Sequence, residues 1–247
     1  MTAIASHRGG AYLWPENSRI AFENTARLAV EQVEFDIHPS SDGRLVVIHD
    51  ATLDRTTDGT GPVAARDWTT LSQLVLKNTG DGRPLLLEEV IEIFAPTQLA
   101  LRIEFKAGAD YRPYPGLPAR LFDILRQTAM IDRAIVTSFH LPTLAEAVQC
   151  GPAQEFIWLM APDVYRHIGA MEDVAALAQR RSIRSLSVPI TLLDDTNIAV
   201  ACRVGVSIGA WGCHTEDTIR RAFTLGVDVF TTDRPDLAIA VRRSSHE

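Results

Sequence analysis

The sequence contains few cysteines, and none of them has the spacing of a metal-ligand pair. Cys150, Cys202 and Cys213 are its three cysteines, an odd number that forms no C-x-x-C motif. An odd count argues against a framework of disulfides, and the missing motif gives no indication of zinc. We therefore expect free thiols that pack as small apolar side chains in a reducing compartment.

Long apolar runs and blocks of basic charge are also absent. No apolar run approaches the roughly 18 residues that a membrane span needs, and the N-terminus lacks the charged and apolar regions of a signal peptide. We expect a cytoplasmic protein without stable membrane insertion. The 24 Lys and Arg residues are scattered among 31 Asp and Glu residues, for a net charge of −7, which argues against nucleic acid as a partner. The sequence carries no signal for an oligomeric state.

Short β-branched runs alternate with segments of helical periodicity along the 247 residues. We predict eight strands, at residues 2–6, 33–37, 98–105, 134–138, 155–160, 183–188, 206–211 and 227–231. Eight strands that are each followed by a helix predict a single domain over residues 1–247, of the α/β class, with the (β/α)8 TIM-barrel fold. An open doubly wound sheet ranks second, because the early HRGG stretch is not a G-x-G-x-x-G dinucleotide loop.

One segment interrupts the alternation after the second strand. HPSSDGRLVVIHD predicts a β-hairpin around Asp42 and Gly43, and a two-residue turn there would place Asp36 directly opposite His49. Residues 51–86 then contain many Thr, Gly and Asp residues but few apolar ones. We interpret them as a small inserted lobe that covers one end of the barrel.

Polar side chains gather at the predicted strand ends, where barrels of this kind carry their chemistry. The candidates from the first three strands and the hairpin are His7, Arg8, Glu34, Asp36, His49, Glu104 and Lys106. Glu34 and Asp36 are two residues apart, so both carboxylates point to the same face of one strand. A surface ion pair is an equally good interpretation of Glu104 and Lys106 taken alone. The coincidence of three carboxylates, two histidines and two cations favours a functional site.

These residue types together indicate one kind of chemistry. Three carboxylates without thiolate make a hard oxygen site, which suits one divalent cation, Mg²⁺ or Ca²⁺, with Mn²⁺ as a further option, better than zinc. Two histidines can serve as general acid and general base near neutral pH. Two cations would bind an anionic small molecule. The set predicts metal-dependent cleavage of a phosphodiester.

The sequence resembles the glycerophosphodiester phosphodiesterase family over nearly its whole length. The resemblance rests on HRG followed by PEN, EFDIHPSSDGRLVVIHD, LDRTTDGTG, IEFK, SF followed by L at positions 138–144, and TTDRPD. It implies a (β/α)8 barrel with an insertion after the second strand and hydrolysis of glycerophosphodiesters to glycerol 3-phosphate and an alcohol. By matching position it also implies metal ligands (Glu34, Asp36, Glu104), an acid–base pair (His7, His49) and phosphate contacts (Arg8, Lys106).

The sequence departs from the family pattern in two places. Ser18 stands where threonine is common, a mild change that keeps a hydroxyl near a helix start. Gly212 and His214 follow Trp211 where Thr and Asn are usual, and this departure bears on the substrate. Trp211 is either a pocket wall that meets the substrate's alcohol or a core residue of the barrel. The sequence leaves the alcohol that departs undetermined.

Three other functions compete with this hypothesis. A lysophospholipase D-type enzyme acting on lysolipids would use the same metal site but would need an exposed apolar groove, and PLLLEEV, the one candidate segment, reads as buried helix. A non-catalytic phosphate-binding protein would be free to lose a histidine or a carboxylate, yet this sequence keeps all of them. An aldolase-type barrel would need a Schiff-base lysine or an enolate-stabilising set.

Overall fold

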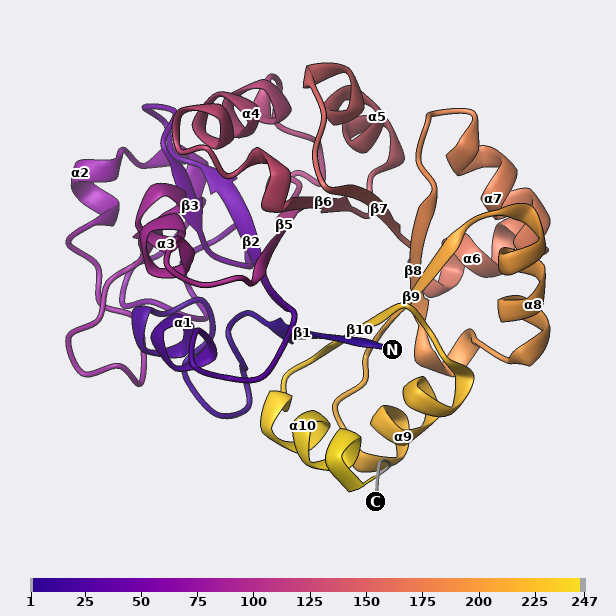
Figure 1. Ribbon diagram of the computed structural model, residues 1–247. Coiled ribbons are helices and arrows are strands. Elements are labelled where there is room, and N and C mark those ends of the chain that lie inside the picture. Colours follow the sequence, from indigo (N-terminus) through magenta and orange to yellow (C-terminus); the bar gives the residue numbers. More distant parts are fainter. Residues whose placement is uncertain (1, 245–247) are drawn as a thin grey trace.

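Eight parallel strands close into a barrel in the computed structural model, which describes residues 2–244 (Figure 1). The barrel strands are β1 (Ala3–His7), β2 (Gln32–Pro39), β5 (Ala100–Phe105), β6 (Ala134–Ser138), β7 (Glu155–Leu159), β8 (Ser185–Pro189), β9 (Ser207–Trp211) and β10 (Val229–Thr232). β1 pairs with both β10 and β2, which closes the ring. The predicted TIM barrel is confirmed, with strand ends that differ from the prediction by at most two residues.

Helices surround this ring on its outer side (Figure 1). They are α1 (Arg19–Thr25), α3 (Leu87–Phe94), α4 (Leu117–Gln127), α5 (Leu141–Cys150), α6 (Pro162–Ile168), α7 (Met171–Gln179), α8 (Asp195–Val204), α9 (Glu216–Leu225) and α10 (Pro235–Ser244). The sequence sets several of their boundaries directly. For example, α8 begins at a capping box formed by Asp194 and Asn197 and ends at Gly205 in the left-handed conformation.

The main hydrophobic core lies between the strands and the helices. Val33, Phe35 and Ile37 of β2 belong to it and are fully buried, and Phe35 packs edge-on against Phe22 of α1 at a centroid distance of 5.7 Å. Because side chains alternate along a strand, the residues between these three point into the barrel. The inward face of β2 therefore carries polar residues, and the fold places them at the barrel's centre.

The hairpin that follows β2 differs from the prediction. β3 (Leu45–Val47) pairs antiparallel with the end of β2, with Ile37 opposite Val47 and Pro39 opposite Leu45. The loop contains three residues, 41–43, because Gly43 takes a φ of 85° and the chain closes with a hydrogen bond from Ser40 N to Arg44 O of 2.8 Å. The two-residue turn that would place Asp36 opposite His49 does not form, and Asp36 instead lies opposite Ile48, whose N donates a hydrogen bond of 3.1 Å to Asp36 O.

The segment between β3 and β4 (Leu85–Leu86) leaves the ring at the left of Figure 1. It contains α2 (Trp68–Leu71), and a second small hydrophobic cluster forms there, which includes Ile48, Leu53 and Val63. β4 pairs with β3 and leads directly into α3. Among residues 2–244, no helix is both long and apolar enough to cross a membrane.

Candidate functional site

Three buried carboxylates meet inside the barrel at the carboxyl end of its strands. Glu34 and Asp36 come from β2 and Glu104 comes from the neighbouring strand β5, where it pairs in register with Asp36. One oxygen from each lies within 4.8 Å of the others. The three residues are 3%, 0% and 6% exposed. Carboxylates this close and this dry repel one another, so they need positive charge from the protein or from a bound ion.

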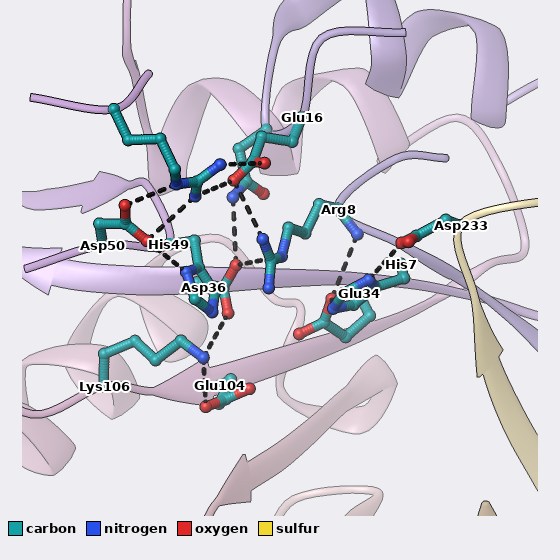
Figure 2. Close-up of polar contacts among 12 residues, drawn as sticks. His7, Arg8, Glu16, Glu34, Asp36, His49, Asp50, Glu104, Lys106 and Asp233 are labelled. Carbon is teal, nitrogen blue, oxygen red and sulfur yellow. Dashed lines mark hydrogen bonds and ion pairs between the residues drawn. The ribbon is translucent and has the colours of Figure 1, made fainter. Parts of the chain in front are cut away.

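Part of that positive charge comes from two cations in the cluster (Figure 2). Lys106 Nζ lies 2.6 Å from Glu104 Oε1 and 3.0 Å from Asp36 Oδ1. Arg8 Nε lies 3.5 Å from Asp36 Oδ2, to which Asn17 also donates a hydrogen bond of 3.1 Å. The side chain of Lys106 is only 14% exposed, so the interpretation of Glu104 and Lys106 as a surface ion pair is wrong.

The pKa values of the carboxylates show that these cations do not neutralise the cluster fully. Burial and the neighbouring Asp36 carboxylate raise the pKa of Glu34 from 4.5 to about 7. Burial also favours the protonated form of Asp36, but Lys106, His49 and Arg8 outweigh it and hold the pKa of that carboxyl far below its usual value. Glu34 is thus partly protonated near neutral pH when no other cation is bound. The oxygen donor set and its unbalanced charge fit a hard divalent cation.

His7 reaches the cluster from the end of β1. Its Nδ1 lies 2.5 Å from Asp233 Oδ1, while its Nε2 lies 3.8 Å from Glu34 Oε2. Burial lowers the pKa of His7, but the carboxylates of Glu34 and Asp233 raise it further, so the net shift is upward. Asp233 orients the ring and leaves Nε2 as the nitrogen that faces the carboxylates.

His49 is held in the same manner on the other side of the cluster in Figure 2. Its Nδ1 lies 2.6 Å from Asp50 Oδ1, and Arg55 Nε in turn donates to Asp50 Oδ2 over 2.7 Å. Burial lowers the pKa of His49 more than the charge of Asp36 raises it. Arg55 also binds Glu16 over 2.7 and 2.8 Å. Arg55, from the segment after β3, thereby connects the Asp50–His49 pair to Glu16 in the loop that follows β1.

These groups line a cavity of about 330 Å³. All seven polar candidates except Asp36 line it, together with Trp211, Gly212 and His214 from the end of β9. Trp211 donates a hydrogen bond from Nε1 to Met160 O over 3.2 Å and packs edge-on against Phe139. Trp211 is therefore a wall of the pocket rather than a residue of the closed core.

Several residues of this site were missed by the sequence reasoning. Asp50, Arg55 and Asp233 lie within motifs that were recognised, yet the role of each as a partner of a site residue follows only from tertiary contacts. Arg102, on the inward face of β5, also lines the cavity. Because side chains alternate along a strand, its position two residues before Glu104 predicts that both side chains point into the barrel.

Comparisons with known proteins agree with this geometry. The model of the glycerophosphoryl diester phosphodiesterase family matches residues 7–237, which confirms the resemblance seen in the sequence. A glycerophosphodiester phosphodiesterase of Bacillus altitudinis is 30% identical over 98% of both chains.

Solved structures share the fold closely. A crystal structure from Agrobacterium tumefaciens str. C58, assigned as a glycerophosphoryl diester phosphodiesterase, aligns with a TM-score of 0.96 at 36% identity over 100% of this chain and 99% of its own. An Oleispira antarctica phosphodiesterase in complex with the product sn-glycerol-3-phosphate aligns with a TM-score of 0.81 over 98% and 97% of the two chains. At 20% identity, the second match shows the fold alone.

Proposed function

Because the chain belongs to the glycerophosphoryl diester phosphodiesterase family, we propose that it hydrolyses glycerophosphodiesters to glycerol 3-phosphate and an alcohol. One observation carries this proposal. A buried triad of carboxylates, two cations and two carboxylate-bound histidines gather around a single pocket, which all of them except Asp36 line. The reaction needs charge stabilisation at the phosphoryl group and proton transfer at two oxygens, and this set of side chains offers both.

The proposed cofactor is a divalent cation held by Glu34, Asp36 and Glu104, either Mg²⁺ or Ca²⁺, with Mn²⁺ as the third choice. Such an ion would act as a Lewis acid toward the phosphoryl oxygens when bound. The close approach of the three buried carboxylates supports this assignment, and the raised pKa of Glu34 agrees with it, because a group that is partly protonated near neutral pH lies where positive charge is still lacking.

Arg8 and Lys106 are proposed to bind the phosphoryl oxygens. Both cations line the cavity, and both are held in place by carboxylates, Arg8 by Glu16 over 3.1 Å and Lys106 by Glu104 over 2.6 Å. A cation that is already oriented costs no reorganisation when charge redistributes on the phosphoryl group during displacement. Each side chain should therefore contribute more to turnover than to folding.

His7 and His49 are proposed to divide the two proton transfers. One imidazole removes a proton from the water that attacks phosphorus, and the other gives a proton to the alkoxide as its bond to phosphorus breaks. In both residues Nδ1 is bound to a carboxylate, of Asp233 or Asp50. That contact fixes the ring, stabilises its protonated form and leaves Nε2 free for the transfer.

A panel of diesters and metals tests the proposal. The chelator-treated protein is assayed on glycerophosphodiesters with varied head groups, with Mg²⁺, Mn²⁺ or Ca²⁺ restored. We expect glycerol 3-phosphate as the product, no turnover without metal, and loss of both turnover and calorimetric metal binding in Asp36→Asn and Glu104→Gln. Glu92→Gln, at an exposed position on α3, is the matched control. Full turnover in the presence of chelator, or none with any diester and metal, contradicts the proposal.

A lysolipid substrate is the second candidate, and one observation favours it. Phe139 lies at the cavity with 42% of its surface exposed and packs against Trp211, so the pocket has an apolar part at its rim. The PLLLEEV segment offers no such surface, because Leu85, Leu86 and Leu87 are buried. Lysophosphatidylcholine in the same panel separates the two candidates. Preference for it over glycerophosphocholine would identify a lysophospholipase D-type enzyme.

A further inference from the structure

Arg102 is a buried charged side chain that the proposed mechanism does not use. The residue is 1% exposed and is the largest fully buried side chain in the part of the chain that the structure describes. Neither of its terminal nitrogens, NH1 and NH2, has a hydrogen-bond partner among residues 2–244. Buried arginines are rare unless they are paired, because each lost hydrogen bond of a charged donor is costly. Two free donors at one buried guanidinium therefore indicate a partner that arrives from outside the chain.

The position of Arg102 shows where that partner would lie. Arg102 and Glu104 share the inward face of β5, and Arg102 lies nearer to the amino end of the strand, in register with Glu34 of β2. Its side chain lines the same cavity as the carboxylate triad. Arg102 therefore lies at the closed end of the pocket, deeper in the barrel than Glu104, whereas Phe139 and Trp211 line the part formed by the carboxyl ends of β6 and β9.

Three acids act on the guanidinium of Arg102. Burial lowers the pKa of the guanidinium, and the carboxylates of Glu34, Glu155 and Glu104 oppose this effect without reversing it. Glu155 is engaged with the hydroxyl of Ser185 at 2.5 Å. These acids thus offset part of the cost of the buried charge, while NH1 and NH2 of Arg102 have no hydrogen-bond partner among residues 2–244.

The side chains that line this cavity besides the charged cluster fit a small polyol. Thr137, which is in register with Glu104, and Thr231 line the same cavity as Arg102 with hydroxyl groups, and both threonines are buried. Guanidinium donors and hydroxyl groups match the oxygens of a glycerol chain, whereas a cationic or bulky head group would meet a positive charge at a closed wall. Glycerophosphodiesters differ in the size of the head group but share the same glycerol moiety. A closed end of the pocket has a fixed size, so it can accommodate the glycerol but not the variable head group.

We propose that Arg102 binds the hydroxyl oxygens of the substrate's glycerol moiety and makes this site selective for diesters of glycerol 3-phosphate. The proposal rests on the function proposed above and adds the residue that recognises the glycerol. Arg102 acts here as a specificity residue and takes no part in the proton transfers.

A ligand pair that differs only in the hydroxyl groups tests this assignment. The dissociation constants of glycerol 3-phosphate and n-propyl phosphate are measured by calorimetry on the Mg²⁺-saturated protein, for wild type, Arg102→Met and Arg102→Lys. Hydrogen bonds to a charged group contribute enough that wild type should bind glycerol 3-phosphate at least about tenfold more tightly. Arg102→Met should lose most of that preference, while its affinity for n-propyl phosphate stays within about threefold of wild type.

Arg102→Lys keeps the charge near Glu34 and Glu155 but loses the fork of donors, so it should fold even where the methionine variant does not and should show a reduced preference. Arg27→Met, at an exposed position, is the matched control and should bind both ligands as wild type does. Equal weakening of both ligands in the Arg102 variants would assign Arg102 to the phosphate and overturn the proposal. An unchanged preference would overturn it as well. A wild-type protein that hydrolyses no glycerophosphodiester defeats the proposed function, and the calorimetric preference is measured independently of turnover.

Discussion

Replacing Glu34 by Gln in the metal-free protein should remove a pH dependence of stability that the carboxylate triad creates. Glu34 is 3% exposed, and burial together with the Asp36 carboxylate raises its pKa from 4.5 to about 7. Between these two pH values the folded protein holds a proton that the unfolded chain has released. The free energy of unfolding of the metal-free protein therefore falls as pH rises through this window. One pKa unit corresponds to about 1.36 kcal/mol, so the total loss is on the order of 3 kcal/mol.

The variant separates this contribution from the other titrating groups. Glutamine keeps the size and polarity of the side chain but has no proton to lose in this range. His7, whose pKa is also raised by Glu34, acts in the same direction, since its favourable protonated form is lost as pH rises. Wild type should thus lose more stability than Glu34→Gln between pH 5 and pH 8.

Urea denaturation of the chelator-dialysed proteins at several pH values measures the difference. The Glu92→Gln control should follow the wild-type curve, and saturating Mg²⁺ should flatten the wild-type curve, because an ion that binds only the folded state replaces the proton on Glu34. Parallel pH profiles for wild type and Glu34→Gln in the absence of metal would falsify the charge imbalance on which the metal assignment rests.

Three further predictions concern proton transfer and the backbone. His7→Ala and His49→Ala should each lower hydrolysis of a natural diester by about 10²- to 10⁴-fold while still binding metal, and a nitrophenyl diester should rescue only the variant that lacks the general acid; near-wild-type turnover in both variants contradicts the two-histidine scheme. Asp233→Asn should lower kcat at least tenfold with little change in KM, because it alters the orientation of a ring rather than a substrate contact; a changed KM at constant kcat would argue against this positioning role. Gly9→Ala should cost at least about 2 kcal/mol in urea denaturation, because Gly9 has a φ of 78° and a Cβ there would lie 2.8 Å from a neighbouring Cβ, whereas Gly61→Ala, with a φ of 81° and open space around it, should cost about half as much or less.

The barrel and the inward direction of the carboxylates follow from local patterns in the sequence. Strand and helix periodicities depend on residues a few positions apart, so eight strands could be predicted without knowledge of their neighbours. The same holds for Glu34 and Asp36, whose separation of two residues places them on one face of β2 whatever lies beside it. The convergence of the strand ends was also predictable, because closing a parallel barrel brings them to one rim.

Contacts between distant segments required the tertiary structure. Asp233 lies 226 positions after His7, and no local pattern connects the two residues before β1 and β10 pair. Which residue lies opposite Asp36 in the hairpin depends on whether the loop has two residues or three, because one additional loop residue shifts the register of the whole strand pair.

Burial and charge balance were likewise decided by the fold. A sequence shows that Arg102 is cationic. Only the assembled barrel shows that the side chain is enclosed, that its terminal nitrogens lack hydrogen-bond partners among residues 2–244 and that three carboxylates act on its pKa. The same applies to the opposite pKa shifts of Glu34 and Asp36, two carboxyls on one strand. Local chemistry determined which groups are present, and the three-dimensional packing determined their solvation and their neighbours, on which electrostatic energies depend.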